Sequence, residues 1–158
     1  MSSLWASRAA FHDLVVEADR AYPLETGGVL VGYFADNGEP VIFAAVGPGP
    51  AAIHSRYRFT PDHGWQCSQL EILFEQSSGK LVYLGDWHTH PDGLPQMSWL
   101  DKRTLRAIAK HPQALTPQPL MLIGAGAVQR WAWTGHQYRG DRLLGLVTDS
   151  EKHELRSF

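Results

Sequence analysis

Residues 80–101 read Lys80-Leu-Val-Tyr-Leu-Gly-Asp-Trp-His-Thr-His-Pro-Asp-Gly-Leu-Pro-Gln-Met-Ser-Trp-Leu-Asp101. The apolar start of this stretch predicts a strand over 80–90, and its end opens a helix over about 98–110. Side chains alternate between the two faces of a strand, so His88 and His90 point to the same side. Two imidazoles are thereby aimed at one point.

Asp101 is the third candidate metal ligand. The loop after His90 contains prolines and a glycine that can turn the chain back onto the end of the strand. Two histidines and one carboxylate with an open fourth position form an arrangement that catalytic zinc sites use. Ser98-Trp-Leu-Asp101 also matches a helix-capping box, which by itself needs no histidines nearby. We predict a zinc ion held by His88, His90 and Asp101, with capping as the alternative role for Asp101.

The rest of the chain alternates between helical and strand patterns. Apolar spacings of three and four predict a helix from about Ala9 to Ala21, and Thr60-Pro-Asp62 opens another that runs to about Gln76. Strands are predicted over 27–34, 41–46, 57–59, 120–123 and 128–133, and the tail from Gln137 is ambiguous. These elements predict one α/β domain over residues 1–158, with a mixed β-sheet flanked by helices.

Composition narrows the class of protein. The chain has 158 residues, of which 44% are hydrophobic and 19% charged, values that suit a single globular domain. A net charge of -2 without a run of Lys or Arg argues against a nucleic-acid partner. No stretch has the pattern of a signal peptide or a membrane span, so we expect a cytoplasmic protein without a membrane partner. The single cysteine, Cys67, excludes an internal disulfide and is expected to be a buried thiol.

The spacing of the candidate ligands resembles a known motif. His88-Thr-His90-Pro91, then six residues, then Ser98-x-x-Asp101, with Glu25 upstream in Glu-Thr-Gly-Gly28, resembles the motif of the JAMM (JAB1/MPN/Mov34) metalloproteases. The resemblance covers about 11–133. It implies a JAMM/MPN fold, similar to the layered cytidine-deaminase architecture. It also implies Zn²⁺ at His88, His90 and Asp101, Glu25 as general base and Ser98 as the hydrogen-bond donor to the oxyanion.

The resemblance also implies a substrate class. JAMM proteases hydrolyse isopeptide or peptide bonds at the C-terminus of ubiquitin or a ubiquitin-like protein. Glu-Thr-Gly-Gly28 and Gly85-Asp-Trp-His-Thr-His-Pro91 look like stretches of the small JAMM peptidases of CBASS antiphage operons. Such peptidases act on a ubiquitin-like protein or on the C-terminal tail of a CD-NTase, and they work beside an E1/E2-like conjugating enzyme. The alternatives are a JAMM peptidase that trims a sulfur-carrier protein and an inert MPN scaffold, although retention of all the motif residues argues against the scaffold.

Other residues near the motif carry weaker predictions. Without the resemblance, Glu25 reads as an exposed acid between a helix and a strand. Gly27 and Gly28 predict a close backbone approach. Asp86 lies on the same strand face as His88, and either orients an imidazole or is a solvated acid. Trp87, Met97 and Trp99 either shape a substrate groove or belong to the core. The remaining histidines are expected at the surface or at helix ends, namely His12, His54, His63, His111, His136 and His153.

Overall fold

A computed structural model describes residues 1–158 of the chain. The helices are α1 (Arg8–Ala21), α2 (His63–Gln76) and α3 (Trp99–Lys110). The strands are β1 (Ser2–Ala6), β2 (Gly27–Phe34), β3 (Pro40–Val46), β4 (Ile53–His54), β5 (Phe59–Thr60), β6 (Val82–Pro91), β7 (Leu120–Ala127), β8 (Arg130–Arg142) and β9 (Val147–Ser157). Every helix and strand predicted from the sequence is present, with bounds within a few residues except for β8, which continues well beyond its predicted end at residue 133 to Arg142.

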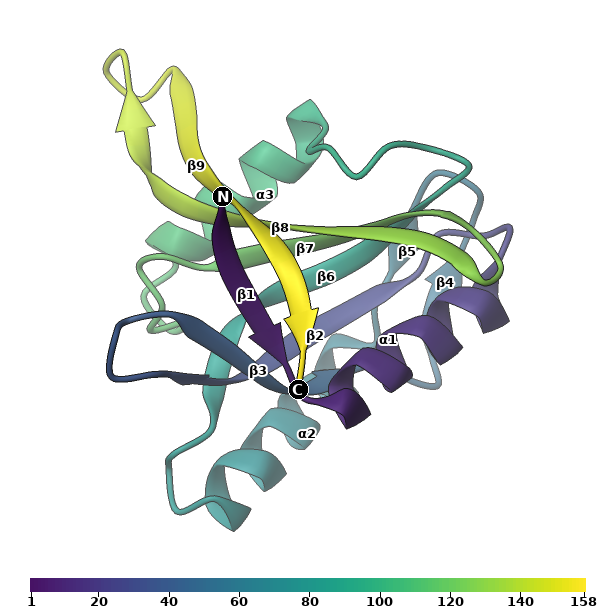
Figure 1. The fold of residues 1–158 in the computed structure, drawn as a ribbon, viewed down its shortest axis with the longest axis horizontal. Helices are drawn as coiled ribbons and strands as arrows, with labels where there is room; N and C mark the ends of the chain where they lie inside the picture. Colours follow the sequence, from purple (N-terminus) through teal and green to yellow (C-terminus); the bar gives the residue numbers. More distant parts are fainter.

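The large sheet is mixed and closes on itself. Its strands follow the order β1-β3-β2-β6-β7-β8-β9, and β1 pairs in parallel with both β3 and β9. β6 pairs antiparallel with β2 and parallel with β7, so the strand that carries the two histidines lies inside the sheet (Figure 1). The mixed sheet with flanking helices confirms the predicted fold class. The closure was not predicted, because it depends on β1 and on the part of the tail that lacks a clear pattern.

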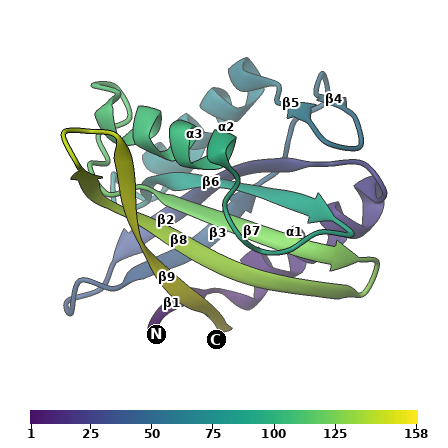
Figure 2. The ribbon, with the colours of Figure 1, turned by 90° about the horizontal axis from the view of Figure 1, so that it is seen from above.

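The helices cover opposite faces of the curved sheet. Ala10 and Leu14 of α1 pack with Leu84 and Trp87 inside the curve. On the other face, α2 packs on valines of β2 and β3, and α3 packs through Leu105 on β7. Figure 2 shows α2 and α3 together above the sheet, with α1 below it. Because Trp87 points toward α1, the alternation along β6 turns its neighbours in sequence toward α2 and α3.

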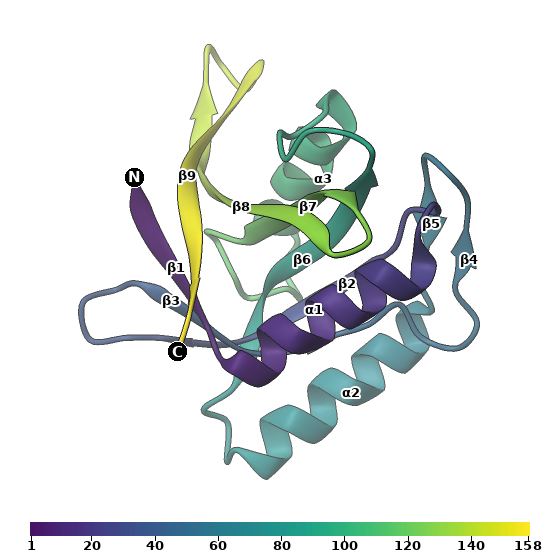
Figure 3. The ribbon, with the colours of Figure 1, turned by 45° about the vertical axis from the view of Figure 1, so that its right-hand side comes forward.

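The small sheet of β4 and β5 stands at the end of the molecule opposite the turn between β8 and β9 (Figure 3). It touches the segment between α1 and β2. The amide of Glu25 donates to the carbonyl of Ser55 at 2.8 Å, and Nδ1 of His54 lies 2.9 Å from the carbonyl oxygen of Glu25. The main chain of Glu25 is therefore held in place on both sides.

Three expectations about single side chains are wrong. Cys67 is exposed rather than buried, because α2 faces the sheet through Trp65, Leu70 and Leu73, and Cys67 lies on another side of the helix. His136 and His153 are buried rather than at the surface, since β8 continues to Arg142 and pairs with β9.

None of the helices is long and apolar enough to cross a membrane.

We expect His153 to make stability depend on pH. Its side chain is buried and neither ring nitrogen has a hydrogen-bond partner. Burial lowers its pKa below the ordinary value of 6.5, although Glu151 opposes this shift. As the pH falls, the unfolded chain therefore takes up a proton at this histidine before the folded chain does. The contribution of His153 to the free energy of unfolding is fully present above about pH 6.5 and is lost as the pH drops through the lower pKa of the folded state.

The variant His153→Leu cannot titrate at this position. Its free energy of unfolding, measured with urea at about pH 7.5 and about pH 5, is expected to change less than that of the wild type. Equal changes in the two proteins would contradict the assignment.

Candidate metal centre

The donor atoms of His88, His90 and Asp101 converge, as predicted from the sequence. Nε2 of His88 lies 3.0 Å from Nε2 of His90 and 3.1 Å from Oδ1 of Asp101, while Nε2 of His90 lies 3.4 Å from Oδ2. Ligand atoms about 2.0 Å from a tetrahedral zinc ion are about 3.3 Å from one another. The separations of His88 from His90 and from Oδ1 are close to this value, His90 approaches the other carboxylate oxygen, and one donor atom from each residue lies within 4.8 Å of the other two. The three residues could therefore hold a tetrahedral zinc ion, and three protein ligands would leave its fourth position open.

The hydrogen bond of His90 fixes which ring nitrogen can bind a metal. Its Nδ1 lies 2.9 Å from the carbonyl oxygen of Leu94. A carbonyl oxygen only accepts, so Nδ1 carries the proton and donates it. When the ring is neutral, Nε2 is left with a lone pair that points toward His88 and Asp101, whereas in the metal-free chain a protonated Nε2 can donate to Asp101. A backbone carbonyl commonly orients a metal-binding histidine in this way.

Asp101 serves both as a helix cap and as a member of the donor cluster. Ser98 Oγ accepts from the amide of Asp101 at 3.1 Å, and the amide of Ser98 donates to Oδ2 of Asp101 at 2.7 Å. The capping box is thus complete at the start of α3. Oδ1 is not used by the cap and faces His88. The two alternatives left open by the sequence are therefore compatible.

The charges at the cluster suit a metal cation. Burial acts to raise the pKa of Asp101, but hydrogen bonds with His88 and His90 outweigh it and hold that pKa well below its usual range. The carboxylate is therefore ionised at neutral pH, as a ligand must be. The hydrogen bond to Asp101 raises the pKa of His90, against the opposing effect of burial.

Glu25 lies in the same pocket as His88 and Asp101. This pocket of about 290 Å³ lies on the α2 and α3 side of the sheet, and its wall includes Phe59 of β5 and Leu100 of α3. Burial raises the pKa of Glu25, although His88 and His90 oppose the shift. A raised pKa makes a carboxylate a better proton acceptor at neutral pH. The interpretation of Glu25 as an exposed acid is not supported by this placement.

Comparison with known proteins identifies the family to which the chain belongs. A family model described as prokaryotic homologs of the JAB domain matches residues 7–134. The chain belongs to the prokaryotic JAB family. A relative from Sinorhizobium fredii named "Probable metalloprotease y4qB" is 35% identical over 148 residues, which cover 91% of this JAB chain and 90% of the relative.

Two further relatives carry a more specific name. A protein of Escherichia coli named "CD-NTase/cGAS isopeptidase" is 27% identical, covering 74% of the JAB chain and 70% of the relative. A Vibrio cholerae protein of the same name is 29% identical, covering 68% and 65%. The family and these names confirm the prediction of a metallopeptidase.

A solved structure resembles the whole JAB fold. The solution structure of a protein from Desulfitobacterium hafniense superposes with a TM-score of 0.68 at 19% identity, covering 98% of this chain and 92% of that one. At this identity the likeness shows only that the fold is shared.

The two glycines of the JAB motif allow β2 to pass close to its neighbours. A Cβ on Gly27 would clash with the carbonyl of Trp87 and the ring of Phe59, and one on Gly28 would clash with the carbonyl of Val46. The predicted close approach is confirmed. Gly27 pairs with His88 across the β2–β6 ladder. This register brings Glu25, two residues earlier, to the metal end of β6.

Thr26 and Thr89 tie the Glu25 segment to the JAB metal strand. Both residues are fully buried. The amide of Thr26 donates to Oγ1 of Thr89 at 3.0 Å, and the amide of Thr89 donates to the carbonyl of Thr26 at 2.8 Å. These bonds join the residue after Glu25 to the residue between His88 and His90. The candidate base Glu25 and the candidate ligands His88 and His90 are thus held by one hydrogen-bonded pair.

Asp86 does not orient an imidazole. It lines the pocket, but its Oδ1 accepts a hydrogen bond from the hydroxyl of Tyr83 at 2.6 Å and makes none to His88. Burial raises the pKa of Asp86, although the Tyr83 hydrogen bond opposes the shift. The half-buried carboxylate of Asp86 is thus bonded to Tyr83 and makes no contact that would orient an imidazole.

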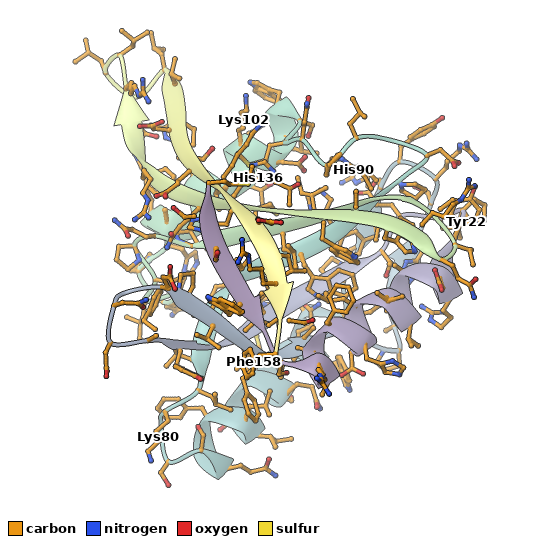
Figure 4. All side chains as sticks on the ribbon, viewed as in Figure 1. Tyr22, Lys80, His90, Lys102, His136 and Phe158 are labelled. Carbon is orange, nitrogen blue, oxygen red and sulfur yellow. The ribbon has the colours of Figure 1, made fainter.

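The apolar residues around the JAB motif divide between the core and the surface. Trp87 is core, and Met97 packs against the Leu105 cluster. Trp87 also lines the pocket, whereas Trp99 is 74% exposed and lies outside its lining. Sequence reasoning overlooked His136, which lies on β8 near the loop before α3 (Figure 4). No sequence signal pointed to it, because the predicted strand ended at Trp133.

Proposed function

We propose that this protein is a zinc-dependent isopeptidase that cuts the bond after the C-terminal residue of a CD-NTase or a ubiquitin-like protein joined to its target. The observation that carries the proposal is the convergence of the donor atoms of His88, His90 and Asp101, two of which, His88 and Asp101, line the same pocket as Glu25. The relatives named CD-NTase/cGAS isopeptidase support the substrate class.

Hydrolysis needs a proton acceptor beside the attacking water. When bound, zinc polarises that water and lowers its pKa toward about 7. The Glu25 carboxylate accepts the proton that the water loses as its oxygen bonds to the scissile carbonyl carbon. Glu25 then passes the proton to the leaving nitrogen as the C–N bond breaks, which releases an amine. One carboxylate serves in both steps, so no second acid is required.

Ser98 is suited to stabilise the negative charge on the scissile carbonyl oxygen. Its Oγ already accepts a hydrogen bond from the Asp101 amide, which fixes the position of the oxygen. Its hydroxyl proton remains free to donate to the oxyanion. Ser98 therefore caps α3 and supplies this donor with the same side chain.

The pocket suits an extended protein tail better than a folded surface. The large sheet is closed, so the free strand edge beside the pocket belongs to β5, whose Phe59 lines the wall. A tail that lies along a strand edge is bound mainly through its backbone. Such binding tolerates varied sequences. We propose that the enzyme reverses conjugation by an E1/E2-like enzyme in the cytoplasm, as part of bacterial antiphage defence.

The proposal can be tested with three purified fusions. Each joins green fluorescent protein to the C-terminus of a different protein from the same genome: a CD-NTase, a ubiquitin-like protein or a sulfur-carrier protein. Zinc-loaded enzyme is expected to cut the CD-NTase or ubiquitin-like fusion after its last native residue. Chelator should stop the cleavage, and added zinc should restore it. Cleavage of the sulfur-carrier fusion alone would contradict the proposed pathway, and cleavage of none would contradict the peptidase.

A further inference from the structure

We propose that His136 is a positioning residue. It holds the loop between β6 and α3, and this loop places the ligands at the end of β6 and at the start of α3 relative to each other. His136 lies on β8 and is only 2% exposed. Its Nε2 lies 3.1 Å from the carbonyl oxygen of Pro95. Because that oxygen only accepts, Nε2 carries the proton and donates it, and it has no lone pair left for a metal.

The sheet register explains how a residue of β8 reaches this loop. His136 pairs with Met121 of β7, and Met121 pairs with Asp86 of β6. Paired residues point to the same face, so His136 shares the face that carries His88 and is covered by α3. His90 and His136, both labelled in Figure 4, come from β6 and β8, which are separated by β7.

The loop depends on few interactions of its own. The amides of Asp92 and Gly93 donate hydrogen bonds to the carbonyl oxygens of Gly126 and His90, respectively. At the other end of the loop, Ser98 caps the start of α3. Between them, residues 94–97 make no backbone hydrogen bond to another backbone group. Their only hydrogen bonds are those that the carbonyls of Leu94 and Pro95 accept, from His90 and His136 respectively.

These two adjacent carbonyls link the loop to the metal site. The Leu94 carbonyl holds His90 in the form that binds a metal, and Pro95 precedes Ser98 by three residues. The N–H of His136 fixes the carbonyl of Pro95, which lies in the chain between the Leu94 carbonyl and Ser98. A displaced loop would move the acceptor of His90 and the start of α3, and with it Asp101. Burial also lowers the pKa of His136, which keeps the ring neutral with a single N–H to donate.

The test compares zinc affinities of the full chain by competition with a chromophoric chelator. It rests on the metal centre of the proposed function and needs no substrate. His136→Leu removes the donor, and we expect zinc affinity to fall at least about tenfold, the lower end for groups that orient metal ligands. His136→Gln keeps an N–H near the position of Nε2 and is expected to stay within about threefold of the wild type.

His153→Leu is the matched control, because His153 is equally buried but its ring makes no hydrogen bond to the loop. It should bind zinc as the wild type does. Unchanged affinity in His136→Leu would overturn the inference, as would an equal loss in the Gln variant or in the control. Zinc binding without cleavage in the wild type would count against the proposed function alone, whereas a wild type that binds no zinc would overturn both.

Discussion

Glu25→Gln is expected to lower the rate of peptide hydrolysis by about 10²–10⁴-fold, the range typical for loss of a general base. The amide has nearly the shape of the carboxylate but cannot accept the proton that water loses. His88, His90 and Asp101 are untouched, so the variant should still hold about one zinc per chain. The two quantities to measure are kcat on a cleaved fusion and the metal content of the purified protein.

Glu17→Gln is the matched control for this substitution. Glu17 is a partly buried carboxylate that accepts a hydrogen bond from Thr26, the residue after Glu25, but it does not line the pocket. It should retain activity within a few-fold. Full activity in Glu25→Gln would show that another group is the base. Loss of zinc from that variant would make Glu25 a ligand instead.

Asp101→Ala is expected to remove zinc binding and, with it, all cleavage. The substitution takes away one of three donors, so affinity should fall by more than about 100-fold, the upper limit for residues that only orient a ligand. It also deletes the acceptor for the amide of Ser98. The measurement is the zinc dissociation constant, followed by thermal unfolding of the metal-free chain.

Ser98→Ala separates the two roles of Asp101. It breaks the same capping box from the other side, at an expected cost of about 1 kcal/mol in the free energy of unfolding. The zinc ligands remain, so affinity should change little. If the two variants bound zinc equally well, Asp101 would be a cap and not a ligand.

The local pattern of the sequence was enough to predict half of this site. Alternation along β6 placed His88 and His90 on one face, and the spacing of Ser98 and Asp101 predicted the capped start of α3. Both relations involve neighbours in sequence, where geometry is nearly independent of the rest of the fold. Most helices and strands were predicted for the same reason.

The other half depends on contacts between distant segments. Glu25 reaches the metal end of β6 only because Gly27 pairs with His88, and no local pattern specifies that register. The family resemblance supplied what spacing could not. His136 and His153 were expected at the surface because the strands that bury them, β8 and β9, lie in a tail without clear periodicity. Burial there follows from closure of the sheet, a property of the whole fold.

Diffraction from a zinc-soaked crystal at the zinc absorption edge tests the central claim most directly. We expect one anomalous peak per chain, about 2.0–2.2 Å from Nε2 of His88, Nε2 of His90 and a carboxylate oxygen of Asp101. The carboxylate of Glu25 should lie outside bonding distance, with room for a water between it and the ion. A peak away from these three residues, or a peak bonded directly to Glu25, would contradict the account.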